Sequence, residues 1–120
     1  MNDPAYSSLT NSEALSEVRF VYDYVQLIFG LYTLSLYAPL RVLVAGGSFT
    51  RNDAGYYDHI CSLIGQSLVA IVRNDRVQLE FSFANGTNLI TSLLENEAVG
   101  PEVAQLSRLG GELMIEDYEH

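Results

Sequence analysis

The stretch DYVQLIF at Asp23–Phe29 returns as DRVQLEF at Asp75–Phe81, 52 positions further along a chain of 120 residues. In both copies apolar residues recur at every second position, which is the pattern of a strand with one buried face. The similarity begins at Val18, and it continues where TLSL at Thr33–Leu36 matches TNLI at Thr87–Ile90. The sequence therefore predicts two copies of one strand-turn-strand unit.

The breaks between the apolar runs define what each copy contains. Polar breaks occur at Tyr22–Asp23 and Arg73–Asp75, and Asn85–Gly86 is a dipeptide favoured in tight hairpin turns. Each copy is thus predicted to be a three-stranded meander. The alternating apolar residues are Val25, Leu27, Phe29 and Leu31 in the first copy and Val77, Leu79, Phe81 and Phe83 in the second. We expect the meanders to be related by a pseudo-dyad and to bury the first three of each set in one shared core.

Two further strands are predicted outside the repeated segments. LRVLVA at Leu40–Ala45 ends at a pair of glycines, and GELMIE at Gly111–Glu116 lies near the end of the chain. The total is seven or eight strands. We therefore expect an α+β fold, mainly antiparallel β, in which two tandem three-stranded meander repeats form a sandwich or a partly open barrel.

One amphipathic helix is predicted between the two repeats, over residues 53–64, with Asn52 or Asp53 as its cap. Its apolar face has the spacing i, i+3, i+4 and i+7 and consists of Tyr57, Ile60, Cys61 and Ile64. After the second repeat, GPEVAQLSRLGG at Gly100–Gly111 has a proline at a position suited to the start of a helix. We expect a single helical turn or a loop there.

The length and the hydrophobic content of 48% fit one domain with its own core, over residues 1–120. Within it we expect the first β repeat at 14–45, the helix at 53–64, and the second β repeat with the C-terminal strand at 67–116. Residues 1–13 and 117–120 lack periodicity and are expected to be frayed. The N-terminal stretch does not resemble a secretory signal, and the apolar run near Val25–Leu40 is too interrupted to span a membrane. We expect a cytoplasmic protein.

Metal and cofactor chemistry is not indicated. Cys61 is the only cysteine, so an internal disulfide and a thiolate zinc cluster are excluded, and the two histidines are 61 positions apart. Asp58, His59 and Ser62 do not predict a catalytic relay, because Asp58 points about 100° away from His59 on a helix. AGGS at Ala45–Ser48 lacks the pattern of a phosphate-binding loop and favours a turn. Cys61 is expected to pack in the core.

The segment LIGQSLVAIVRNDRVQLEFSFANGTNL at Leu63–Leu89 resembles a family of small bacterial two-repeat β-rich domains. These carry L-x-G, then an L-x-F strand and an Asn-Gly or Asp-Gly turn, and the resemblance spans roughly Val18–Glu112. NEAV and LGGEL are similar to the family's Glu-Ala-Trp and Pro-Gly-Gly-Glu-Leu, with Val99 and Leu109 in place of the aromatic residue and the proline. Some members are regarded as immunity proteins against bacterial toxins, and the resemblance implies that role without supplying catalytic residues.

The formal net charge is −9, from 15 acidic residues against six arginines. This charge disfavours nucleic acid and favours a basic protein partner. Acidic and aromatic groups of the kind found at interfaces occur in two segments. The candidate partner-binding residues are Glu112, Glu116, Asp117, Tyr118 and Glu119 in one segment and Asp53, Tyr56 and Asp58 in the other. The alternative interpretation is a charged surface that only keeps the protein in solution.

Three functional hypotheses follow. The first is a non-enzymatic immunity-type inhibitor that occludes the active site of a cognate toxin, such as a basic nuclease. A phage-encoded inhibitor of a host complex would share the same acidity. The second is a small-ligand-binding or enzymatic domain with a pocket between the repeats, lined by Tyr22, Tyr24, Tyr37 and the Tyr56–Tyr57 pair. The third is a homo-oligomer, for example a homodimer joined through edge strands.

Overall fold

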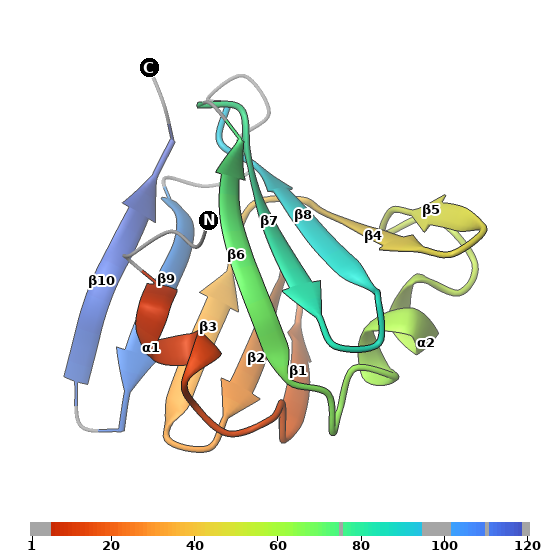
Figure 1. Cartoon of the computed structure of the whole chain (residues 1–120). Helices are drawn as coiled ribbons and strands as arrows, with labels where there is room; N and C mark the ends of the chain where they lie inside the picture. Colours follow the sequence, from red (N-terminus) through yellow and green to blue (C-terminus); the bar gives the residue numbers. More distant parts are fainter. Residues whose placement is uncertain (1–5, 75, 95–101, 110, 119–120) are drawn as a thin grey trace.

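The computed structural model of the chain describes residues 6–74, 76–94, 102–109 and 111–118. Over these residues the chain forms two five-stranded antiparallel sheets and two short helices (Figure 1). The first sheet has the order β1 (Glu17–Val21), β2 (Tyr24–Phe29), β3 (Tyr32–Leu36), β9 (Glu102–Arg108), β10 (Gly111–Asp117). The second has the order β5 (Gly47–Phe49), β4 (Leu40–Val44), β8 (Asn88–Ser92), β7 (Gln78–Phe83), β6 (Leu68–Asn74). The helices are α1 (Ser7–Thr10) and α2 (Tyr56–Cys61).

Each predicted meander forms the centre and one edge of a sheet. β1, β2 and β3 are consecutive neighbours in the first sheet, and β6, β7 and β8 are consecutive neighbours in the second. Each meander is then extended by the hairpin that follows the other one: β4 pairs with β8, and β9 pairs with β3. Strands β1–β5 of the first half correspond, in order, to strands β6–β10 of the second half. The two repeats therefore exchange their last hairpins, which joins both sheets into one domain.

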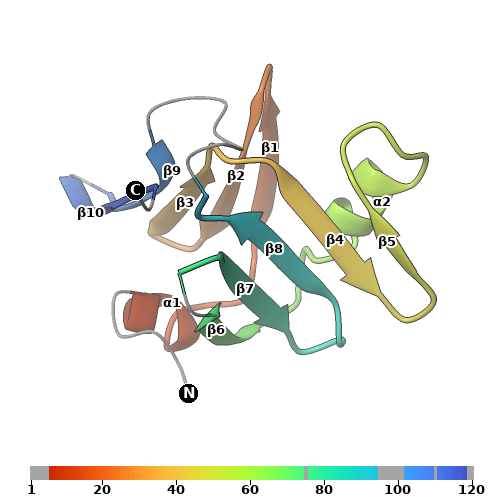
Figure 2. The ribbon, with the colours of Figure 1, turned by 90° about the horizontal axis from the view of Figure 1, so that it is seen from above.

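The core lies between the two sheets, which face each other in Figure 2. Leu27 and Phe29 project into it from β2, and Leu79 and Phe81 project from β7, all four fully buried. Phe29 also stacks on Phe83, with ring centroids 6.3 Å apart. Burial of each large apolar side chain contributes about 1.5–3 kcal/mol relative to exposure. The predicted sandwich is confirmed, because the two sheets do not close into a barrel.

The segment that we expected to be a helical turn or a loop contains strand β9. Leu106 lies opposite Leu34 and Ala104 lies opposite Leu36, and all four side chains are buried. The two residues of β9 between and after them, Gln105 and Ser107, are only partly buried. This period of two belongs to a strand, and β3 offers a free edge whose backbone groups β9 satisfies.

Two residues of the expected alternation are exposed instead of buried. Val77 is 47% exposed, because β7 begins only at Gln78 and the pair Asn74–Gln78 leaves three residues in the turn. The first repeat has a turn of two residues at the same place, between Val21 and Tyr24. Leu31 lies in the turn between β2 and β3 and is also exposed. The prediction that Val77 belongs to the core was wrong.

The helix between the repeats turns a different face to the core than predicted. Helix α2 buries Tyr56 and Ile60, and Leu63 continues that face, whereas Tyr57, Cys61 and Ile64 are exposed. Both sets have helical spacing, so periodicity alone cannot separate them. The helix begins after Gly55, whose φ of 94° suits glycine, and no side chain caps it. The prediction that Cys61 packs in the core was therefore wrong.

The ends of the described chain are ordered, contrary to the expected fraying. Tyr6 and Leu9 of the α1 region are fully buried and close one side of the core. Residue Asp117 is the last residue of β10, and Tyr118 after it is buried. In the part of the chain that the structure describes, no helix has the length and apolar character needed to cross a membrane.

Candidate functional site

A cavity of about 430 Å³ opens where the β1–β2 turn, the β3–β4 connection and the loop before α2 meet. All of these segments are in the first half of the chain. Five tyrosines line the cavity: Tyr22, Tyr24, Tyr37, Tyr56 and Tyr57. They are the five tyrosines that the pocket hypothesis named from the sequence. The hypothesis placed the pocket between the two repeats, whereas no described residue of the second repeat lines this cavity, which is called the tyrosine pocket below.

One wall of the tyrosine pocket belongs to the first sheet. Tyr24 begins β2, and because side chains alternate along a strand, it lies on the opposite face from buried Val25. Tyr37 follows β3 directly and is held in place by a hydrogen bond from its backbone N–H to the carbonyl oxygen of Val103, at 2.8 Å. The two tyrosine rings are in contact, with centroids 4.9 Å apart and an angle of 50° between their planes.

The other wall combines the edge of the same sheet with helix α2. Tyr57 of α2 packs edge-on against Phe20 of β1, with ring centroids 4.8 Å apart. Tyr56 packs edge-on against Tyr57 at 5.0 Å. Edge-to-face contacts of this kind stabilise an aromatic cluster beyond simple burial. They also anchor the short helix, which is too brief to be stable by itself.

Polar groups gather on the loop side of the tyrosine pocket. Thr50, Arg51 and Asn52 line it there, and Asp23 lines it from the β1–β2 turn. The guanidinium of Arg51 donates a hydrogen bond to the backbone carbonyl oxygen of Tyr22, 29 positions away in the sequence. This contact, called the Arg51 clamp below, joins the turn to the loop before α2.

The hydroxyls of Tyr37 and Tyr56, which both line the pocket, differ in their hydrogen-bond partners. The Tyr37 hydroxyl donates to Oε1 of Gln105 at 3.0 Å. The Tyr56 side chain is buried and takes part in none of the hydrogen bonds found among the described residues. Burial, with a smaller contribution from Tyr57, raises the pKa of Tyr56 to about 12, while Arg51 acts in the opposite direction. Tyr56 is one of the lining residues, and its hydroxyl is a protonated hydrogen-bond donor at neutral pH, as in any tyrosine.

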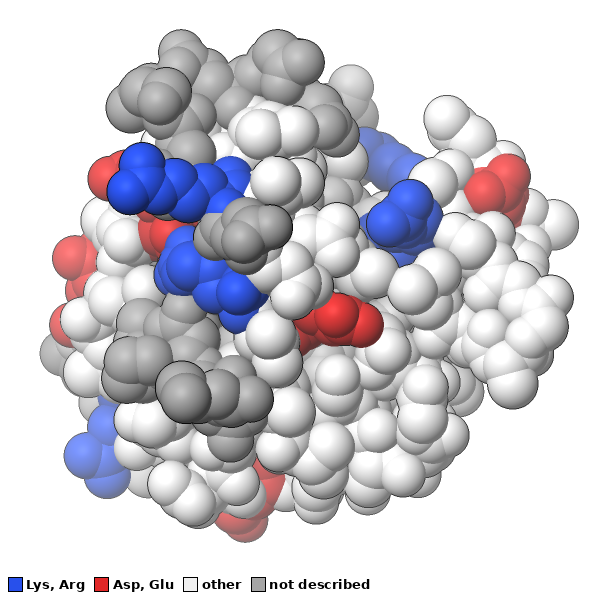
Figure 3. Space-filling model, turned by 45° about the horizontal axis from the view of Figure 1, so that its top comes forward, with Lys and Arg blue, Asp and Glu red and all other residues white. Residues whose placement is uncertain are grey.

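The two groups of predicted partner-binding residues lie on opposite sides of the molecule. In Figures 1 and 2, β10 is at one side and α2 is at the other. They cannot form one continuous surface. In Figure 3, uncharged residues cover most of the visible face, and acidic side chains occur at several separate places on it.

In the C-terminal group, Glu116 and Tyr118 are engaged within the fold. Glu116 forms an ion pair with Arg73 of β6 at 2.7 Å, and its carboxylate also accepts from the Tyr6 hydroxyl at 3.0 Å. Tyr118 is buried, so it cannot be the exposed aromatic anchor that we expected. Glu112 and Asp117 are exposed, and Glu112 accepts a hydrogen bond from Gln105. Glu119 lies outside the described residues.

In the other group, only Tyr56 contributes to the tyrosine pocket. Asp53 is exposed and accepts hydrogen bonds from the backbone N–H and the hydroxyl of Thr50, at 2.8 and 3.1 Å. Its role is to hold the loop that carries Arg51. Asp58 is exposed in the first turn of α2. Tyr56, which we expected at a protein interface, is instead a buried part of the pocket wall.

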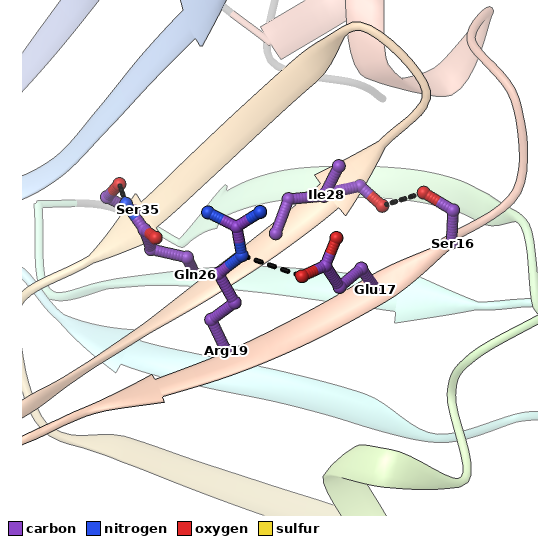
Figure 4. Close-up of polar contacts among 6 residues, drawn as sticks. All are labelled: Ser16, Glu17, Arg19, Gln26, Ile28 and Ser35. Carbon is purple, nitrogen blue, oxygen red and sulfur yellow. Dashed lines mark hydrogen bonds and ion pairs between the residues drawn. The ribbon is translucent and has the colours of Figure 1, made fainter.

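The outer face of the first sheet has polar contacts that connect neighbouring strands (Figure 4). The Gln26 side chain donates to the Ser35 hydroxyl at 3.1 Å. Arg19 and Glu17 form an exposed ion pair at 2.7 Å, with side chains 58% and 49% exposed. Exposed pairs of this kind contribute little to stability. The Gln26–Ser35 contact joins β2 to β3, whereas Arg19 and Glu17 both lie on β1, and none of these four residues lines the tyrosine pocket.

The side chains of Ser62 and His59 are not arranged for catalysis. The Ser62 hydroxyl donates to the backbone carbonyl oxygen of His59 at 2.6 Å, and the His59 ring packs against Phe49 at 4.5 Å. Ser62 and His59 thus contact groups that a relay would not use. No group of three or more His, Cys, Asp or Glu side chains suited to a metal ion occurs within the described ranges.

Phe20 and Arg51 are among the residues of the tyrosine pocket that sequence reasoning missed. Phe20 looked like one more apolar residue of a strand, and Arg51 looked like part of a polar loop. Only the fold brings them next to the tyrosines. No protein-family model, curated protein or solved structure matches this chain.

Proposed function

We propose that the protein is a small binding module that takes an apolar or aromatic group into the tyrosine pocket. The observation that carries this proposal is the cavity of about 430 Å³ with five tyrosines in its wall. Ligand-binding pockets are typically of roughly 300–1,000 Å³, with mostly apolar and aromatic walls and a few polar groups that orient the ligand. Arg51 and the Tyr56 hydroxyl supply those polar groups here.

The ligand can be tested by NMR on the ¹⁵N-labelled protein with a set of small one-ring and two-ring aromatic compounds. We expect shifts to gather on the β1–β2 turn and on α2. Asn52→Trp should fill the pocket mouth and abolish these shifts, because Asn52 is exposed and lines the cavity. Val69→Trp is the matched control, since Val69 is exposed on β6 and is not part of the lining. Shifts that survive Asn52→Trp unchanged would refute the proposal.

A protein partner is the second candidate, in which the tyrosine pocket receives a side chain of that partner. The observation that favours it is the exposed aromatic rim: Tyr22 is 91% exposed, Tyr57 44% and Phe20 40%. Exposed aromatic residues around a cavity are common at the centres of protein interfaces. The net charge of −9 favours a basic partner. An immunity-type inhibitor of a bacterial toxin, implied by the family resemblance, fits this description.

The second candidate is tested with the protein encoded beside this one as partner, in a binding titration. We expect Tyr22→Ala to weaken the complex at least about tenfold, which corresponds to about 1.4 kcal/mol. Leu109→Ala is the control, because Leu109 is also strongly exposed (81%) but lies in the turn after β9, outside the pocket lining. Equal losses in the two variants, or the absence of a complex at low salt, would count against this function.

A further inference from the structure

We propose that the tyrosine pocket selects neutral aromatic ligands that carry a carbonyl-type acceptor, which the Tyr56 hydroxyl and Arg51 recognise. This inference rests on the proposed function, because it names the ligand class of the same pocket. Three features of the pocket carry it: two groups of aromatic rings, one buried donor, and a balance of charge.

The aromatic rings favour a planar ligand. Tyr24 and Tyr37 contact each other on one wall, and Phe20, Tyr57 and Tyr56 contact one another in series on the other. A flat ring between such walls can make edge-to-face or offset contacts with both, each worth about 0.5–1.5 kcal/mol beyond burial. Aliphatic ligands of the same size lack this term.

The buried donor favours a ligand with an acceptor. Tyr56 is only 3% exposed, and its hydroxyl has no hydrogen-bond partner within the described part of the chain. A ligand that displaces solvent from this hydroxyl without offering an acceptor would leave the hydroxyl unpaired, which costs roughly 1–3 kcal/mol. A carbonyl oxygen of a ligand in the pocket would accept from this hydroxyl, which is protonated at neutral pH like that of any tyrosine. An apolar ligand would instead leave the hydroxyl unsatisfied.

The charges around the pocket favour a neutral acceptor over an anion. The charged residues of the lining are Arg51 and Asp23, which balance each other. The whole chain has a net charge of −9, which repels an anionic ligand at a distance. Arg51 already donates one hydrogen bond to the Tyr22 carbonyl oxygen, and a guanidinium has five N–H donors. It can therefore support a carbonyl group without releasing the Arg51 clamp.

The test compares three probes that share one ring system. The probes are 2-acetylnaphthalene, which has a neutral acceptor, 2-ethylnaphthalene, which has none, and 2-naphthoate, which is an anion. Their dissociation constants are measured by NMR titration with the wild-type protein, Tyr56→Phe and Tyr37→Phe. Tyr37→Phe is the matched control, because it also removes a hydroxyl from the pocket lining, but one that is already bonded to Gln105.

We expect the wild-type protein to bind 2-acetylnaphthalene most tightly of the three probes. Tyr56→Phe should weaken that probe about tenfold and change the binding of 2-ethylnaphthalene by less than about twofold. Tyr37→Phe should leave the order of the three probes unchanged. The inference is overturned if the acetyl and ethyl probes bind equally, if both phenylalanine variants behave alike, or if 2-naphthoate binds best.

The failure of the proposed function itself would look different. If none of the three probes shifts the resonances of the β1–β2 turn or of α2, the tyrosine pocket does not bind aromatic groups. Both the function and this inference would then be rejected. If the probes bind there without a preference for an acceptor, the binding function stands and only the ligand class is wrong.

Discussion

The two open sides of the sandwich are built from equivalent elements but carry different side chains. On one side, edge strands β6 and β10 lie next to α1, and on the other, edge strand β1 lies next to α2 and the loop after β5. An arginine joins the two edges on each side. Arg73 binds the carboxylate of Glu116 on the first side, whereas Arg51 binds only a backbone carbonyl oxygen on the second.

The two sides also differ in how their side chains are packed. On the α1 side, Tyr6 and Leu9 are fully buried, and Glu116 is 12% exposed in its ion pair. On the α2 side, the aromatic groups stand around a cavity instead of filling it. Because the strands are equivalent, the cavity is not a consequence of the fold. It follows from the particular side chains placed at that side.

The largest effect is expected on the closed side, from Glu116→Ala. This change removes both hydrogen bonds to Arg73, at 2.7 and 3.2 Å, and leaves a mostly buried guanidinium without that carboxylate. Breaking a buried ion pair costs about 3–5 kcal/mol, and partial exposure of Arg73 reduces this to about 2–3 kcal/mol of unfolding free energy. Urea denaturation measures it, with exposed Asp117→Ala as the control.

A loss below about 0.5 kcal/mol for Glu116→Ala, equal to that for Asp117→Ala, would contradict this comparison. It would mean that the Arg73–Glu116 ion pair adds no more stability to the α1 side than an exposed contact does. The same result would restore Glu116 as a free surface charge available to a partner, as the sequence analysis suggested.

The meanders could be predicted from the sequence because their pairings are local. The alternation in Asp23–Phe29 and Asp75–Phe81, with a turn signal at Asn85–Gly86, is enough to define neighbouring antiparallel strands. The exchange of hairpins could not be predicted, because the partners of β4 and β9 lie far away in the sequence. Segment 102–108 was misassigned for that reason: its strand character depends on the free edge of β3.

The candidate site was predicted only in part, for a similar reason. Tyrosines near turns and around the helix suggested a pocket, and the fold brings these five together. The sequence around Arg51 does not indicate its role, because Tyr22, whose carbonyl oxygen it binds, is 29 positions away and is brought close only by the fold. For the acidic residues, the sequence predicted a binding role that Glu116 does not have the freedom to play. Glu116 reads as one more charge of a tail, although it closes the sandwich against Arg73.

A smaller effect is expected on the open side, in the pH dependence of stability. The pKa of Tyr56 is about 12 in the folded protein and 10 without the fold, so the folded state holds this proton more tightly. The stabilisation is complete below pH 10 and is lost as the pH rises from 10 to 12. We expect the wild type to lose about 2 kcal/mol more over this range than Tyr56→Phe, because the variant lacks the hydroxyl that ionises.

This difference is measured by urea denaturation at a series of pH values, with absorbance at 295 nm to follow tyrosine ionisation. Parallel pH profiles for the wild type and Tyr56→Phe would show that the Tyr56 hydroxyl is well solvated. The pocket would then lack the buried donor on which its ligand preference depends.

The smallest effect on stability is expected from Arg51→Gln, the counterpart of Glu116→Ala on the open side. The Arg51 clamp is exposed and joins two surface segments, so we expect a loss of less than about 0.5 kcal/mol in urea denaturation. Because Arg51 lowers the pKa of Tyr56, its removal should also move the ionisation of Tyr56 to still higher pH. A stability loss as large as that of Glu116→Ala would show that the α2 side is held together by its arginine just as the α1 side is. The residues around the tyrosine pocket would then serve mainly to stabilise the fold, and the comparison between a stabilising side and an open side would fail.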